Sequence, residues 1–193
     1  MSASSYFVVD IETCPLRLEG YSVLSDEDKR KLMNPVDSRI VAIGVRNAGS
    51  SRIFMEQDEK RMLESFWGEW RSIAKSSPGA YIVGFNISRF DLPFITARSF
   101  IHGVVISPFV LKSVVDVREK INAYKYGHYR GRLKEYAAMI GLSFPDMDGS
   151  RVADLCINGE WQKLKEYLES DLFITDKLYQ RLRETNILYI QKW

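Results

Sequence analysis

Three acidic clusters contain the residues of this sequence that are best suited to chemistry. Asp10 and Glu12 come at the end of an apolar run near the N-terminus, and Asp91 follows a second apolar run. Tyr167 and Asp171 form the third cluster, four residues apart. Carboxylate oxygens suit hard cations such as Mg²⁺ and Mn²⁺, which keep coordination positions open for a substrate phosphate. Together the clusters favour metal-dependent chemistry at a phosphate.

Each cluster also has a purely structural interpretation. Alternation along a strand places Asp10 and Glu12 on one face, about 7 Å apart, but a strand that ends there leaves both acids in water. Asp91 or Ser88 can serve instead as the N-cap of the next helix. Asp171 shares a helix face with apolar residues, where an unpaired acid is rare. The agreement among the three clusters favours a shared cation site.

The remaining pattern predicts an α/β fold with a mixed central β-sheet flanked by helices. Apolar, β-branched runs predict strands over 6–11, 39–46, 52–55 and 80–85, and a further short strand ending at Asp116. Apolar residues at helical spacing predict helices over 58–75, 91–101, 133–140 and 160–183. Asp58 can cap the first of these helices, and Asp116 is interpreted as a cap or turn residue. The strands come first, and later strands alternate with helices.

Residues 15–37, between the first two strands, are long for a connection of neighbouring strands. The charged run SDEDKRK within them predicts a short helix over one end of the sheet. Both a lid and a contact surface fit this segment.

A basic segment, Tyr124–Lys134, mixes tyrosines with Lys, Arg and His and contains no acid. Such mixing suits single-stranded nucleic acid, because cations hold phosphates while rings stack on bases. A solvated loop is the alternative. Tyr126 and Arg130 are the first candidates for substrate contact.

Composition narrows the class of protein. The chain has 193 residues, of which 46% are hydrophobic, and a net charge of +2. We therefore expect a single globular domain over residues 1–193. Its two cysteines form no CxxC pair, and neither a signal peptide nor a membrane-spanning run is present, so we expect a cytoplasmic protein. Phosphate-binding glycine motifs are absent.

In order and context, the acidic residues resemble the DEDD superfamily of 3′–5′ exonucleases, which have a ribonuclease-H-like fold. VVDIET, NISRFD and YLESD match its three motifs. A Tyr four residues before the last Asp, with Glu166 where the other branch has His, resembles the tyrosine (DEDDy) branch. From Tyr6 to about Leu182, the sequence is most similar to the exonuclease domain of family B DNA polymerases, here as a stand-alone nuclease.

The resemblance implies two bound ions, Mg²⁺ or Mn²⁺. Asp10 would bridge them, Glu12 and Asp171 would support the ion that activates water, and Asp91 would serve the other. Tyr167 and Glu12 would orient the nucleophile. Implied contacts with the terminal nucleotide are Ile11, Thr13, Leu16, Asn86 and Phe90.

The expected function is therefore hydrolysis of single-stranded DNA from its 3′ end, releasing nucleoside 5′-monophosphates by a two-metal-ion mechanism. An RNA substrate for the same site is the first alternative. A non-catalytic nucleic-acid-binding module is the second. The presence of all four acids and Tyr167 favours an active enzyme, because carboxylates that repel one another destabilise a fold that has no metal.

Overall fold

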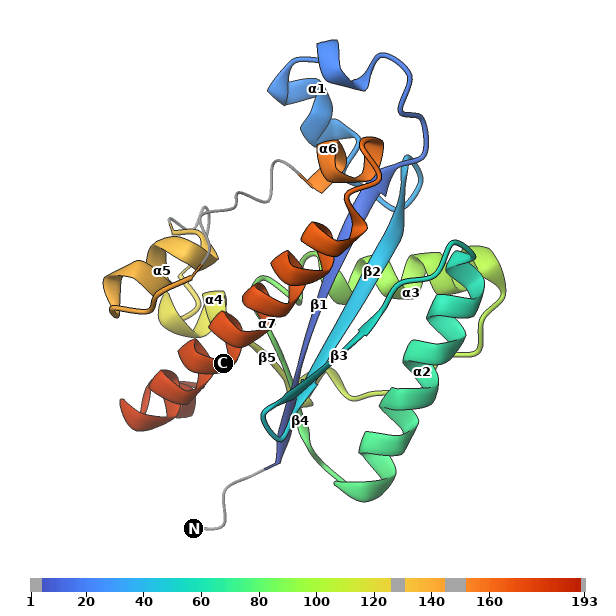
Figure 1. Cartoon of the computed structure of the whole chain (residues 1–193). Coiled ribbons are helices and arrows are strands. Elements are labelled where there is room, and N and C mark those ends of the chain that lie inside the picture. Colours follow the sequence, from blue (N-terminus) through green and yellow to red (C-terminus); the bar gives the residue numbers. More distant parts are fainter. Residues whose placement is uncertain (1–4, 126–130, 145–151, 192–193) are drawn as a thin grey trace.

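A computed structural model describes residues 5–125, 131–144 and 152–191 of the chain. Five strands form one sheet in the order β3-β2-β1-β4-β5 (Figure 1). β1 pairs antiparallel with β2, and β2 pairs antiparallel with β3, whereas β4 lies parallel to both β1 and β5. The strands are β1 (Tyr6–Pro15), β2 (Ser38–Asn47), β3 (Ser50–Phe54), β4 (Tyr81–Gly84) and β5 (Val114–Asp116). The predicted mixed α/β fold is confirmed.

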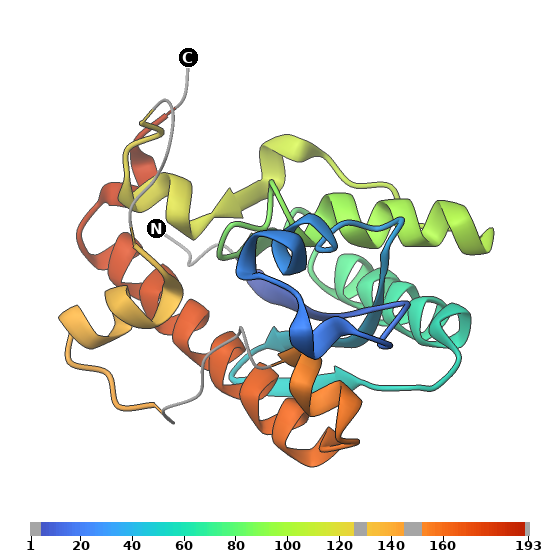
Figure 2. The same ribbon diagram turned by 90° about the horizontal axis from the view of Figure 1, so that it is seen from above.

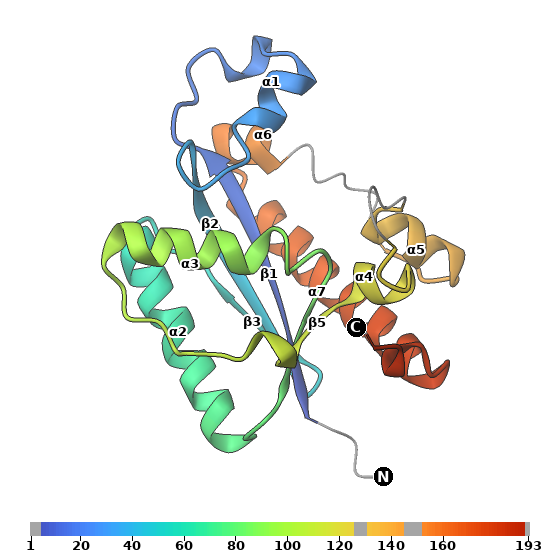
Figure 3. The ribbon, with the colours of Figure 1, turned by 180° about the vertical axis from the view of Figure 1, so that it is seen from behind.

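Helices cover both faces of the sheet. α2 and α3 pack on one face, and α7 crosses the other face together with the shorter α4, α5 and α6 (Figures 2 and 3). The helices are α1 (Asp26–Lys31), α2 (Glu59–Ser76), α3 (Asp91–His102), α4 (Val117–Ile121), α5 (Leu133–Met139), α6 (Val152–Ile157) and α7 (Trp161–Glu184). In the described part of the chain, short 3₁₀ turns cover Tyr21–Val23, Leu111–Ser113 and Ile187–Tyr189.

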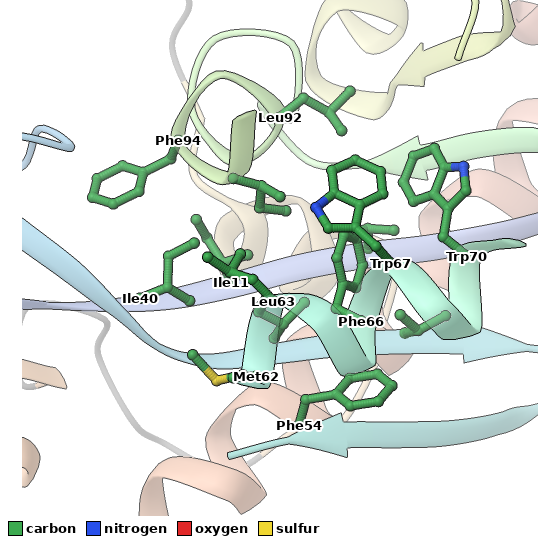
Figure 4. Close-up of a cluster of buried hydrophobic side chains, with 14 of the residues drawn as sticks. Ile11, Ile40, Phe54, Met62, Leu63, Phe66, Trp67, Trp70, Leu92 and Phe94 are labelled. Atoms are coloured by element: carbon green, nitrogen blue, oxygen red, sulfur yellow. The ribbon is translucent and has the colours of Figure 1, made fainter. Parts of the chain in front are cut away.

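The core beneath α2 and α3 is rich in aromatic side chains (Figure 4). Asp58 caps α2 as predicted, accepting hydrogen bonds from the backbone N–H groups of Lys60 and Arg61. Trp67 is fully buried, and its Nε1 donates to Oγ of Ser99 on α3 at 2.9 Å. This bond satisfies the polar atom of the largest core side chain and joins the two helices.

The core on the opposite face depends on a close approach between α7 and β2. A Cβ atom added at Gly44 would lie 2.5 Å from Cδ1 of Leu172 and 3.1 Å from Cγ of Leu168. Only glycine therefore allows the two α7 leucines to pack directly over the middle of the sheet. The predicted apolar face of this helix, including Leu164 and Leu178, is buried as expected.

The structure corrects one expected strand boundary and adds two short helices that the sequence pattern does not predict. The first strand does not end near Ile11 but continues to Pro15, because β2 pairs with it as far as Ser38 across a bulge between Glu12 and Thr13. The sequence also gave no prediction for α4 and α6, which have five and six residues. Helices this short have too few turns to produce a periodic apolar pattern.

Candidate active site

Strand alternation points the two acids of β1 toward α7. Phe7, Val9 and Ile11 join the core beneath α2 and α3. Asp10 and Glu12 occupy the intervening positions and therefore face the other way. Both acids lie within β1, where pairing with β2 fixes the backbone positions of Asp10 and Glu12.

α7 supplies the acid that completes this cluster. Tyr167 and Asp171 lie one helical turn apart and are each 7% exposed. Ligand-capable oxygens of Asp10, Glu12 and Asp171 all lie within 4.8 Å of one another. The structure thus brings together three acids that are separated by up to 161 residues in the sequence.

Asp91 joins the cluster from α3. β4 pairs with β1 only as far as Val8, so the Ile11 N–H lies beyond the part of β1 that is paired with β4. Oδ1 of Asp91 accepts a hydrogen bond from that N–H at 3.1 Å. Its carboxyl interacts with that of Asp10 and, after burial, helps to raise the pKa of Asp10. Phe90, not Ser88 or Asp91, is the N-cap residue of α3, and it makes no side-chain cap hydrogen bond.

Asp116 supports the loop that delivers Asp91. It is 4% exposed and caps α4, accepting from the backbone N–H of Arg118 at 3.0 Å. It also accepts from the backbone N–H groups of Asn86 and Ser88 at 3.0 and 3.1 Å. The sequence predicts the cap, but only the fold reveals that the same carboxylate holds the loop between β4 and α3.

Crowding changes the protonation of these acids. Burial, followed by the charges of neighbouring carboxylates, raises the pKa values of Asp10 and Glu12 well above their usual range. Burial also raises the pKa of Asp91 to about 7 and that of Asp171 to about 6. In the absence of a cation, the cluster therefore resists full ionisation near neutral pH.

Lys134 of α5 is the basic residue closest to this cluster among the described contacts. Its Nζ lies 3.9 Å from Oδ1 of Asp171 and 4.3 Å from the centre of the Tyr167 ring. Its charge lowers the pKa of Asp171 against the larger effect of burial. The sequence places Lys134 in the basic segment, but only the fold brings it beside the acids.

Burial and adjacent negative charge raise the pKa of Tyr167, so its hydroxyl stays protonated at neutral pH.

The donor set fits a divalent cation. Three carboxylates converge, and within the described part of the chain Oδ1 of buried Asp171 has no hydrogen-bond partner. A buried carboxylate oxygen without a partner costs free energy that metal coordination would offset. All-oxygen donors of this kind match Mg²⁺ or Mn²⁺ rather than a softer metal.

The acids form part of the lining of a cleft of about 960 Å³. Of the predicted substrate contacts, Thr13, Asn86 and Phe90 border this cleft. Ile11 also borders it, although the residue is only 4% exposed and belongs to the α2/α3 core. Leu16 is half exposed and does not line the cleft. The predicted contacts Tyr126 and Arg130 lie outside the described residues.

Several cleft residues are not among the individual contacts predicted from the sequence, although most of them lie in residues 15–37 or in the basic segment, which the sequence offered as contact regions. They are Tyr21, Asp26, Lys29, Arg30 and Met33 from the segment between β1 and β2, Phe85 after β4, Arg132 and Lys134 beside α5, and Asp154 on α6. No local motif marks them, because their place in the cleft depends on how distant elements pack.

Comparisons with known proteins identify the family of this chain. Residues 38–187 match the family described as "Predicted 3'-5' exonuclease related to the exonuclease domain of PolB". The chain belongs to this family. It is also 33% identical over 170 residues to the uncharacterised protein MJ0365 of Methanocaldococcus jannaschii, a match that covers 81% of this chain and 92% of that protein.

A solved structure shares the fold. The family B DNA polymerase of the archaeon Pyrobaculum calidifontis superposes with a TM-score of 0.70 and 17% sequence identity, over 96% of this chain. This chain spans about a quarter of that polymerase, since the match covers 25% of it. The ribonuclease-H-like fold predicted from the sequence is thus confirmed. Among the described residues, no helix has the length and apolar character needed to cross a membrane.

Proposed function

We propose that this chain is a 3′–5′ exonuclease of the tyrosine (DEDDy) branch, which uses Mg²⁺ or Mn²⁺ to remove nucleoside 5′-monophosphates from single-stranded DNA. The observation that carries the proposal is the convergence of Asp10, Glu12 and Asp171 within 4.8 Å at the cleft. Asp91 reaches the same cluster from α3. We further propose that residues 1–193 act as one catalytic domain.

In this proposal, four carboxylates would hold two divalent cations. Asp10 would serve both ions, Glu12 and Asp171 would support one, and Asp91 would support the other. When bound, such a pair of ions activates a water molecule and stabilises the leaving oxygen of a phosphodiester. The raised pKa values of the acids support this role, because they reflect buried, mutually repelling negative charge that a divalent cation would neutralise.

Protein groups beside the acids orient the reactants. Tyr167 keeps its proton at neutral pH and therefore donates a hydrogen bond to the attacking water, while Glu12 accepts one. Lys134 brings a positive charge to the same side of the cleft, where it faces the phosphate whose negative charge grows during the reaction. Thr13, Asn86 and Phe90 border the space for the terminal nucleotide.

The product and the preferred substrate test this proposal. Purified protein is incubated with single-stranded DNA and with RNA of matched sequence, in Mg²⁺, Mn²⁺ or EDTA, and the small products are separated by chromatography. We expect deoxynucleoside 5′-monophosphates from DNA with either metal and none in EDTA. Faster release from RNA would replace DNA with RNA as the substrate. Absence of any product with either metal would reject the exonuclease function.

A further inference from the structure

The segment between β1 and β2, residues 16–37, forms one wall of the active-site cleft. Its helix α1 lies beyond the end of the sheet to which β1 leads, next to α6 and apart from α5 (Figures 1 and 3). Asp26, Lys29, Arg30 and Met33 from this segment all line the cleft. Asp26, Lys29 and Arg30 lie three and four residues apart on one side of α1, and Met33 follows the end of the helix.

The two sides of α1 have different electrostatic partners. Lys31, which does not line the cleft, pairs with Glu27 at 3.2 Å and Asp28 at 3.0 Å. Lys29 and Arg30, by contrast, have no acidic partner within 4 Å in the part of the chain that the structure describes. From α1, two basic side chains, Lys29 and Arg30, therefore line the cleft, together with one acidic side chain, Asp26.

Tyr21 helps to position one of these cations. Its ring is buried, and Nζ of Lys29 lies 5.2 Å from the ring centre. Lys29 is thereby held along the cleft wall instead of extending freely into solvent. Met33, which is 55% exposed, adds an apolar surface beside the cations. Cations next to an exposed apolar side chain suit a phosphate backbone with unstacked bases.

Hydrogen bonds fix this wall to the body of the protein. The N–H of Leu16 donates to the carbonyl of Asp37 at 2.8 Å, which closes the base of the segment. Nη1 of Arg98 on α3 donates to the carbonyl of Pro35 at 3.0 Å. Buried Glu59 in turn holds the same arginine through its Nε at 2.9 Å. These anchors favour a preformed contact surface over a lid that opens.

We propose that residues 16–37 bind the sugar–phosphate backbone upstream of the bond that is cleaved, with Lys29 and Arg30 as the phosphate contacts. This inference rests on the proposed exonuclease function. At about 960 Å³ the cleft lies near the upper end of the roughly 300–1,000 Å³ typical of small-molecule sites, so it has room for chain beyond a terminal nucleotide. Arg132 and Lys134 line the same cleft, so basic residues from two segments distant in sequence border it.

Two substrates of different length distinguish the binding of upstream DNA by residues 16–37 from the hydrolysis step at the acids. One is a long single-stranded DNA, and the other is the p-nitrophenyl ester of thymidine 5′-monophosphate, which has no upstream chain. We compare kcat/KM for both substrates in wild type, in the double variant Lys29→Ala/Arg30→Ala and in the matched control Lys31→Ala. The control removes a cation of the same helix that points away from the cleft.

We expect the ratio of kcat/KM for long DNA to that for the ester to fall about 10- to 100-fold in the double variant, with most of the change in KM. The salt dependence for long DNA should become shallower by roughly one to two units of slope. Lys31→Ala should keep the wild-type ratio. A double variant that matches Lys31→Ala would overturn the inference while leaving the exonuclease function intact. Wild-type protein that cleaves neither substrate would reject both.

Discussion

At the scale of single residues, the site is built from carboxylates that oppose one another unless a cation is bound. Asp10, Glu12 and Asp171 crowd together, and Asp91 approaches Asp10 from α3. Each of them has a raised pKa, chiefly because of burial. A cluster of this kind lowers the stability of the metal-free protein, and a bound cation would relieve the repulsion among its carboxylates.

The first prediction concerns the stability of the metal-free protein as pH changes. A carboxyl whose pKa is higher in the folded state than in the unfolded state stabilises the fold while protonated and loses that contribution as pH rises through the folded value. With folded values of about 6 for Asp171 and about 7 for Asp91, the melting temperature in EDTA should fall between about pH 5 and pH 7.5. Circular dichroism during thermal unfolding measures this melting temperature at each pH.

The amide variant Asp171→Asn provides the control for this pH effect. It cannot ionise, so its melting temperature in EDTA should depend less steeply on pH over the same interval, and at neutral pH it should exceed that of wild type. Addition of Mg²⁺ at pH 7.5 should raise the wild-type melting temperature. A wild-type melting temperature that rises with pH in EDTA would contradict the assignment.

The second prediction concerns the hydroxyl group of Tyr167. Because its proton is proposed to orient the attacking water, Tyr167→Phe should lower kcat about 10- to 100-fold with little change in KM. The ring keeps its place under Lys134, so the fold should be preserved. Steady-state kinetics on single-stranded DNA make the comparison. A rise in KM with unchanged kcat would assign the hydroxyl to substrate binding instead.

At the scale of elements, the site depends on how closely α7 packs on the sheet. α7 carries both Tyr167 and Asp171, and its distance from β1 is set by Leu168 and Leu172 over Gly44. Gly44 pairs with Asp10 across β1 and β2. One glycine therefore controls the spacing between the acid of the strand and the acid of the helix.

The third prediction tests this packing with two glycine variants. Gly44→Ala should lower the free energy of unfolding by about 1–3 kcal/mol, because its new methyl group meets the leucines of α7. It should also reduce activity by displacing Asp171. Gly68→Ala, on α2, has no atom within 4 Å of the added Cβ and should stabilise the protein by up to about 1 kcal/mol. Urea unfolding compares them, and equal effects would reject the packing argument.

The sequence pattern predicts the long elements of the fold but not the features that depend on tertiary packing. The long strands and helices carry their own periodicity, and the Asp58 cap and the buried face of α7 followed from it. The bulge after Glu12, the helices α4 and α6, and the place of α1 beside the cleft depend on tertiary pairing. No local pattern encodes those features.

The same distinction applies to the residues of the site. Asp10, Glu12, Asp91, Tyr167 and Asp171 lie in short motifs, so they could be proposed from spacing and resemblance. Lys134 and Asp116 lie outside those motifs, and their contacts with the site arise from packing between distant segments. Leu16 is near the first motif in sequence but does not border the cleft, and its contact with substrate stays a prediction.

At the scale of the whole molecule, a single sheet joins two hydrophobic clusters. The cluster beneath α2 and α3 and the cluster beneath α7 share β1, whose alternate residues contribute to each. Neither face can be exposed without disturbing the strand that holds Asp10 and Glu12. This arrangement supports the proposal that residues 1–193 act as one domain, although the chain matches only about a quarter of the related polymerase.

The fourth prediction follows from the shared sheet. In the double variant Trp161→Phe/Trp193→Phe, the fluorescence of Trp67 and Trp70 reports on the α2 face, while far-ultraviolet circular dichroism reports on all helices, including α7. Because the two cores share β1, both signals should change in one transition with the same midpoint in urea. Two separate midpoints would show that the faces unfold independently and would contradict the proposal of a single domain.

The central claim is that the acids at the cleft hydrolyse the 3′-terminal phosphodiester, and the fifth prediction tests it most directly. A 5′-labelled single-stranded DNA is incubated in Mg²⁺ with wild type, with Asp171→Asn and with Glu169→Gln. The last variant neutralises an acid two residues away that pairs only weakly with Lys165, at 4.0 Å. We predict a ladder that shortens from the 3′ end for wild type and Glu169→Gln, and a loss of at least about 1,000-fold for Asp171→Asn. Wild-type rates in folded Asp171→Asn would contradict the account.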